Sequence, residues 1–199
     1  MLTERDGKIM SWLREYKAIT VNQATHIFFS GCYEGCRRRL KQLSDNNILK
    51  SYNLYEMKDK IYYLEKRIKY HDIVVRDLIK EICKRGGEIW RFKTNPYYMN
   101  GDIIPDAFIE FKLNNNLYFI LLEVDATHFT SAEKMQRYEK LYKTMELQNQ
   151  CYGVFPLLLI ARPTLNDVRY NSKNFDVIYT DMKYSNLDKF LFNIPLRSL

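Results

Sequence analysis

The apolar run LYFILLEV at residues 117–124 constrains the fold more than any other segment of this chain. A strand with one face in water alternates apolar and polar side chains, whereas an unbroken run is typical of a strand covered on both faces. The run therefore predicts the central strand of a β-sheet with helices packed on it.

Segments on both sides of this run complete an α/β domain. A long helix follows it, with Met135, Tyr138, Tyr142 and Met145 at helical spacing on one face. Pro156 confines regular pairing to the later part of the next strand, because proline lacks an amide donor. The predicted elements are strands at 88–93, 103–111 and 117–124, a helix within 130–149, a strand within 154–162, a last strand in FDVIYTD and a short helix in YSNLDKFLF.

The N-terminal third has a different architecture. Apolar residues recur at helical spacing in three successive segments, of which the third buries Cys36, Leu40 and Leu43. A pair of strands joined by a polar turn follows. The predicted elements are helices within 3–17, 20–29 and 32–43 and strands at 48–55 and 60–65. Three helices followed by a hairpin is the order of a winged helix-turn-helix domain.

The character of the sequence changes after Lys66, and we place the domain boundary between residues 69 and 70. Residues 1–69 form the predicted winged-helix domain, and residues 70–199 form the predicted α/β domain. The stretch HDIVVRDLIKEICKRGG is a helix that ends at Gly86. It is either a linker helix or the first helix of the second domain.

Positive charge is concentrated at the N-terminal end. The net charge is +7, and residues 1–69 carry 14 Lys and Arg against 8 Asp and Glu, which accounts for six of the seven net charges. A basic surplus of this kind favours a polyanionic partner. Double-stranded DNA is the partner that a winged helix predicts.

The third predicted helix carries the densest part of this charge, in CYEGCRRRLKQL at residues 32–43. The second helix of a helix-turn-helix motif lies in the major groove, and a hairpin wing contacts the neighbouring backbone. The predicted DNA contacts are Tyr33, Arg37, Arg38, Lys41, Lys58 and Lys60. Two alternatives stay open, namely a solvated basic face and a winged helix that docks onto protein.

Four cysteines are too few and too scattered for a disulfide framework, and we expect free thiols. Cys32, Cys36 and His26 invite a zinc site, but Cys36 belongs to the apolar stripe and no second Cys/His pair follows at a finger-like spacing. The amino terminus lacks a signal-peptide core, and no apolar run is long enough to span a bilayer. We expect a cytoplasmic protein without a membrane partner.

Acidic residues at strand ends mark a candidate site in the second domain. Asp106 lies in IIPDAFIEF, whereas Glu123 and Asp125 end the central strand on the same face, and Lys134 follows on the next helix. Such a cluster suits Mg²⁺ or Mn²⁺ and phosphodiester hydrolysis. From the residues alone we favour the alternative, in which Asp106 and Asp125 cap turns and Glu123 pairs with Lys134 or an arginine.

The stretches PDAFIEF and YFILLEVDATHFTSAEKMQRY resemble the replication-relaxation family of plasmids and integrative elements of Gram-positive bacteria. The pattern is P-D, then E-x-D, then K-x-x-x-Y. The chain also resembles the PD-(D/E)xK nuclease fold, which implies a restriction-endonuclease-like α/β domain with Asp106 and Glu123 as metal ligands. The active motif has lysine two residues after the glutamate, where this chain has Asp125; Lys134 is the candidate replacement.

Three functions follow as expectations. The first is a sequence-specific DNA-binding accessory or regulatory protein for replication, mobilisation or conjugative transfer of a mobile element, with a degenerate nuclease-like domain and no required cofactor. The second is a metal-dependent endonuclease that nicks or cleaves DNA. The third is an adaptor that docks a relaxase or secretion complex. Recognition of a two-fold site by a single short helix favours a homodimer.

Overall fold

The computed structural model describes residues 2–126, 129–165 and 170–191 and divides the chain into two compact units, residues 1–86 and 87–199. Among these described residues, each unit has its own β-sheet, with three strands in the first and five in the second. The division falls after the helix that follows residue 69, whereas the composition placed it before that helix. None of the described helices is long and apolar enough to cross a membrane.

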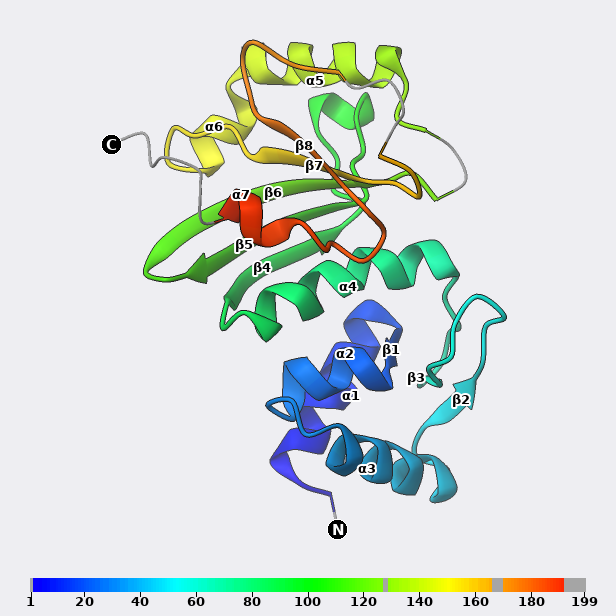
Figure 1. Cartoon of the computed structure of the whole chain (residues 1–199). Helices are drawn as coiled ribbons and strands as arrows, with labels where there is room; N and C mark the ends of the chain where they lie inside the picture. Colours follow the sequence, from blue (N-terminus) through cyan, green and yellow to red (C-terminus); the bar gives the residue numbers. More distant parts are fainter. Residues whose placement is uncertain (1, 127–128, 166–169, 192–199) are drawn as a thin grey trace. The chain divides into compact units, whose positions relative to one another are not determined.

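The first unit contains four helices and three short strands in its described residues (Figure 1). The strand β3 lies between β1 and β2 and pairs with both in antiparallel orientation. The two expected strands therefore form, although each is only three residues long. The elements are α1 Glu4–Tyr16, β1 Ala18–Thr20, α2 Val21–Phe28, α3 Tyr33–Asp45, β2 Lys50–Tyr52, β3 Ile61–Tyr63 and α4 Tyr70–Lys84.

Local sequence signals set the helix starts of this unit. Thr3 caps α1 in a capping box with Asp6, and Thr20 caps α2 in a second box with Gln23. The predicted stripe on α3 is buried, with Cys36 and Leu40 at 0% and Leu43 at 1% exposure. These side chains share one core with apolar residues of α1, β1, α2 and β3, so α3 presents its opposite side to solvent.

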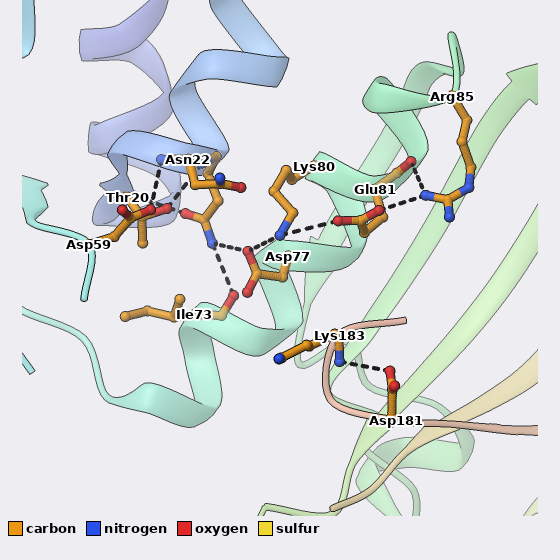
Figure 2. A network of polar contacts seen from close by, with 11 residues as sticks. Thr20, Asn22, Asp59, Ile73, Asp77, Lys80, Glu81, Arg85, Asp181 and Lys183 are labelled. Carbon is orange, nitrogen blue, oxygen red and sulfur yellow. Dashed lines mark hydrogen bonds and ion pairs between the residues drawn. The ribbon is translucent and has the colours of Figure 1, made fainter. Parts of the chain in front are cut away.

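A polar network joins α4 to α2 within the first unit (Figure 2). The side-chain amide of Gln23 donates to the carbonyl of Ile73 and to Asp77 Oδ1, both at 3.1 Å. Lys80 lies 3.2 Å from Asp77 and 3.3 Å from Glu81, and burial raises the pKa of the Asp77 carboxyl. These contacts, made by buried and half-buried groups, explain why α4 groups with the helices that precede it.

The second unit is a mixed sheet in the order β4-β5-β6-β7-β8 (Figure 1). β5 pairs with β4 and with β6 in antiparallel orientation, whereas β7 pairs with β6 and with β8 in parallel orientation. The described elements are β4 Glu88–Thr94, the 3₁₀ turn Met99–Gly101, β5 Ala107–Leu113, β6 Asn116–Val124, α5 Ala132–Thr144, α6 Glu146–Gln150, β7 Leu157–Ala161, β8 Val177–Thr180 and α7 Leu187–Leu191.

The central position of the LYFILLEV segment is confirmed, because β6 is the middle strand and residues 120–124 on it are buried. β7 begins directly after Pro156, as expected. The long helix within 130–149 is interrupted at Met145, whose φ of 59° ends α5 before α6 begins. The strand expected from residue 103 starts only at Ala107.

Candidate functional site

One cation of α3 points into the first unit, and the others mark the exposed side of the helix. Arg39 borders the buried stripe and reaches α1, where its Nη2 lies 2.5 Å from Oδ2 of Asp6 and its Nε 3.0 Å from Oδ1. Asp6 is fully buried, and its hydrogen bonds from Arg39 hold the pKa of the carboxyl well below its usual range. Arg39 therefore belongs to the packing of the first unit.

The three cations predicted to contact DNA are on the exposed side of α3. Arg37 pairs with Glu34 at 2.9 Å, and Lys41 pairs with Asp45 at 2.6 Å. Arg38 forms no ion pair within the described residues. Exposed pairs of this kind contribute little to stability, so they exchange readily for other partners.

The remaining predicted contacts lie at the start of α3 and before β3. Tyr33 is 40% exposed at the first turn of α3, and Lys58 and Lys60 are both exposed. Between these two lysines, Asp59 accepts a hydrogen bond of 3.1 Å from the backbone amide of Asn22 at the start of α2 (Figure 2). This contact fixes the β2–β3 connection against α2, where the helix dipole favours a carboxylate.

The cysteines do not form a zinc site. Cys36 is buried in the core, and burial raises the pKa of its thiol to about 11, whereas a zinc ligand is a thiolate. Cys32 is exposed and free. In the part of the chain that the structure describes, no three His, Cys, Asp or Glu side chains are grouped as a metal site.

Glu123 is the centre of the candidate site in the second unit. It lies near the end of β6 with 2% exposure, and its two carboxylate oxygens each accept a hydrogen bond from α5. Lys134 Nζ lies 2.6 Å from Oε2, and the hydroxyl of Tyr138 lies 2.5 Å from Oε1. The interpretation that Glu123 pairs with Lys134 matches this geometry.

Asp106 lies beside this group, directly before β5. Its Oδ2 accepts a hydrogen bond of 2.7 Å from the backbone amide of Val124. The pKa of Glu123 rises to about 7, mainly because the carboxyl is buried. The Lys134 ammonium acts to lower this pKa, and the nearby charge of Asp106 acts to raise it. The structure therefore brings together Asp106, Glu123 and Lys134.

Asp125 contacts a different set of residues. Its Oδ1 accepts hydrogen bonds from the amide and hydroxyl of Thr130, and its Oδ2 lies 2.7 Å from Nη2 of Arg162. Arg162 is itself buried and lies over the ring of Tyr179, with 4.5 Å from its guanidinium carbon to the ring centroid. Asp125 thus joins the ends of β6 and β7 as a buried ion pair.

Each of these carboxylates has partners within the protein. Both oxygens of Glu123 and both of Asp125 accept hydrogen bonds from protein groups. A carboxylate oxygen that accepts one hydrogen bond keeps a second lone pair, so a divalent metal at Glu123 would share these oxygens with Lys134 and Tyr138. The Lys134 ammonium supplies a compensating positive charge at Glu123. Tyr138 and Arg162 complete the arrangement, and sequence reasoning did not assign a contact to either of them.

Comparison with known proteins gives one result. The family model for replication-relaxation matches residues 55–158, just over half of the chain. This span includes Asp106, Glu123, Asp125, Lys134 and Tyr138 but not Arg162. No curated protein and no solved structure matches the chain.

Proposed function

Because the chain belongs to the replication-relaxation family, which connects it with plasmid replication or mobilisation, we propose that it binds double-stranded DNA through α3 as an accessory or regulatory protein. The process it serves is replication, mobilisation or conjugative transfer of a mobile element. The second unit acts as a nuclease-like scaffold without a required cofactor.

The order of elements in the first unit supports a winged helix. α2 and α3 follow one another across a short turn, and β2 and β3 form the hairpin that comes next. In such a domain α3 is the recognition helix, and the β2–β3 connection with Lys58 and Lys60 is the wing. A basic helix of this type contacts phosphates and guanine edges in the major groove.

The distribution of charge on α3 is the observation that carries the proposal. Of four cations within five positions, Arg39 binds Asp6 in the interior, and Arg37, Arg38 and Lys41 remain on one exposed side. A basic face that only contacts water does not need one of its cations to turn inward and the other three to share one exposed side. The predicted wing adds the exposed Lys58 and Lys60, so the proposal has two elements that reach DNA.

A homodimer is part of this proposal, because one winged helix contacts only a short half-site. Sedimentation equilibrium at the concentrations used for DNA binding tests it. A single species of twice the chain mass is expected with a two-fold DNA site, whereas a monomer on the whole site contradicts it.

A metal-dependent endonuclease is the second candidate, and one contact favours it. Lys134 reaches Glu123 from α5 and restores a lysine beside the carboxylates, although the lysine is absent at residue 125. The engagement of both Glu123 oxygens argues against this candidate. We derive no cleavage step from the arrangement.

The experiment incubates the purified protein with supercoiled DNA of its own element in EDTA, Mg²⁺ or Mn²⁺, and scores band shifts and nicks together. A salt-sensitive shift without nicking supports the DNA-binding function. Metal-dependent nicking that Glu123→Ala abolishes, while the shift persists, supports the endonuclease. Neither shift nor nick, together with capture of a relaxase or transfer protein, supports an adaptor.

A further inference from the structure

A groove separates the start of α1 from one side of α3 in the first unit. Its volume is about 860 Å³, and it is partly open to solvent. α3 lines it with Gly35, Arg38, Lys41 and Gln42, so the groove adjoins the helix that carries the proposed DNA contacts. Arg5 lines the facing side, on α1.

The groove carries a net positive charge. Four cations line it against two carboxylates, and each carboxylate already has its own cation: Asp6 binds Arg39, and Asp45 binds Lys41. Arg5 and Arg38 are the two lining cations that form no ion pair with any residue the structure describes. The guanidinium groups of Arg5 and Arg38 thus line a groove whose net charge is positive.

Arg5 is held in position by an aromatic ring. Its guanidinium carbon lies 4.5 Å from the ring centroid of Phe29, which is itself 7% exposed at the end of α2. The ring face is no conventional hydrogen-bond acceptor, so the guanidinium of the exposed Arg5 keeps its N–H groups for other acceptors. A planar guanidinium of this kind suits the oxygens of a phosphate.

We propose that this groove binds the sugar-phosphate backbone of one DNA strand, with Arg5 as a phosphate contact from α1 that works beside Arg38. The inference rests on the proposed DNA-binding function and extends it to a second element. DNA is favoured over an acidic polypeptide because Arg38 and Lys41 line the groove and also belong to the exposed face of α3. A strand that follows α3 therefore passes along the groove.

Cys32 makes the groove accessible to measurement. It is exposed and lines the groove, whereas Cys36 and Cys151 are buried and Cys83 is only partly exposed. A thiol reagent should therefore label Cys32 first. A bound DNA strand should slow this labelling, and Cys32→Ser removes the fast phase and verifies its origin.

The test combines labelling with affinity on duplex DNA from the element. Arg5→Ala is compared with Lys8→Ala, which removes an equal charge from the same helix at a residue that pairs with Glu4 at 2.9 Å. We expect Arg5→Ala to weaken binding about fivefold and to lower the salt slope by about one. Lys8→Ala should change affinity less than about twofold, and DNA should slow labelling of Cys32 about fivefold or more.

The outcomes separate the two proposals. If α3 variants weaken DNA binding while Arg5→Ala binds like the wild type and DNA leaves Cys32 labelling unchanged, the groove is not a DNA site and the proposed function stands. If the wild-type protein binds no DNA, both fail. If an acidic polypeptide protects Cys32 and DNA does not, the groove belongs to a protein partner and the inference is overturned.

Discussion

Arg39 Nη2 lies 2.5 Å from Oδ2 of Asp6, and this ion pair connects α3 to α1 beneath the proposed DNA-binding face. Arg39 is flanked in sequence by Arg38, which forms no ion pair within the described residues. Two adjacent arginines on one helix therefore have different roles. Arg39 stabilises the fold, and Arg38 remains available to a partner.

Replacing Arg39 by alanine is expected to destabilise the first unit. The buried Asp6 carboxylate would lose the hydrogen bonds from its partly exposed cation, and we expect the free energy of unfolding to fall by about 2–3 kcal/mol. Urea unfolding in a Trp90→Phe background, in which Trp12 is the remaining tryptophan, measures this in the same unit. Arg38→Ala is the matched control and should leave unfolding unchanged while it weakens DNA binding. Equal stability of the two variants would contradict the division of roles.

Glu34 and Asp45 are expected to oppose DNA binding. Each of these carboxylates pairs with a cation of the α3 face. A DNA phosphate must therefore displace the carboxylate from that cation and then lie near the negative charge of the carboxylate. The double variant Glu34→Gln and Asp45→Asn should bind DNA about threefold more tightly at low salt, with the difference shrinking as salt rises. Fluorescence anisotropy at several salt concentrations measures this. Weaker binding by the double variant would mean that α3 does not face DNA.

Glu123 gives a pH dependence of stability. Burial raises the pKa of this carboxyl from 4.5 in the unfolded chain to about 7, so the folded protein holds a proton that the unfolded chain has released between these values. The free energy of unfolding should therefore fall as pH rises through this window, by at most about 3 kcal/mol. Glu123→Gln should lack this fall.

Urea unfolding from pH 4.5 to 8 measures the difference in the free energy of unfolding between the wild type and Glu123→Gln. His26, whose pKa is lowered by burial, favours the opposite trend near its ordinary pKa of 6.5, but it is common to both proteins and cancels. A difference that does not vary with pH would show that Glu123 stays ionised throughout.

Asp125 is expected to stabilise the second unit. Asp125→Ala would leave the buried Arg162 guanidinium without its carboxylate, at a cost of about 3–5 kcal/mol. Arg162→Met in the same chain should recover part of this loss, because the uncompensated charge is removed. Urea unfolding in a Trp12→Phe background, in which Trp90 is the remaining tryptophan, measures both variants. An unchanged Asp125→Ala protein would return Asp125 to the list of candidate site residues.

The sequence predicts what depends on local periodicity. The unbroken run at 117–124 locates β6, and the spacing of Cys36, Leu40 and Leu43 fixes which side of α3 is buried. Arg39 lies three residues after Cys36 and four before Leu43, so the same spacing places it beside the stripe. That signal was sufficient to separate it from Arg37 and Arg38.

Partners distant in sequence leave no such signal. Arg162 lies 37 residues from Asp125, and only the parallel pairing of β6 with β7 brings the two together. β1 consists of three residues, too few for a period-two pattern, and it forms because β3 supplies its hydrogen-bond partners. The packing of α4 on α2 likewise depends on Gln23, whose contacts lie 50 and 54 residues away.

Duplex binding by the triple variant Arg37→Ala, Arg38→Ala and Lys41→Ala tests the central claim most directly. Anisotropy of labelled DNA from the element, measured at increasing salt, gives affinity and salt slope together, and circular dichroism verifies that the variant is folded. The account predicts that a folded triple variant binds no better than an unrelated protein, with a salt slope lowered by about three. Wild-type affinity in the folded variant would contradict the assignment of α3 as the DNA-binding helix.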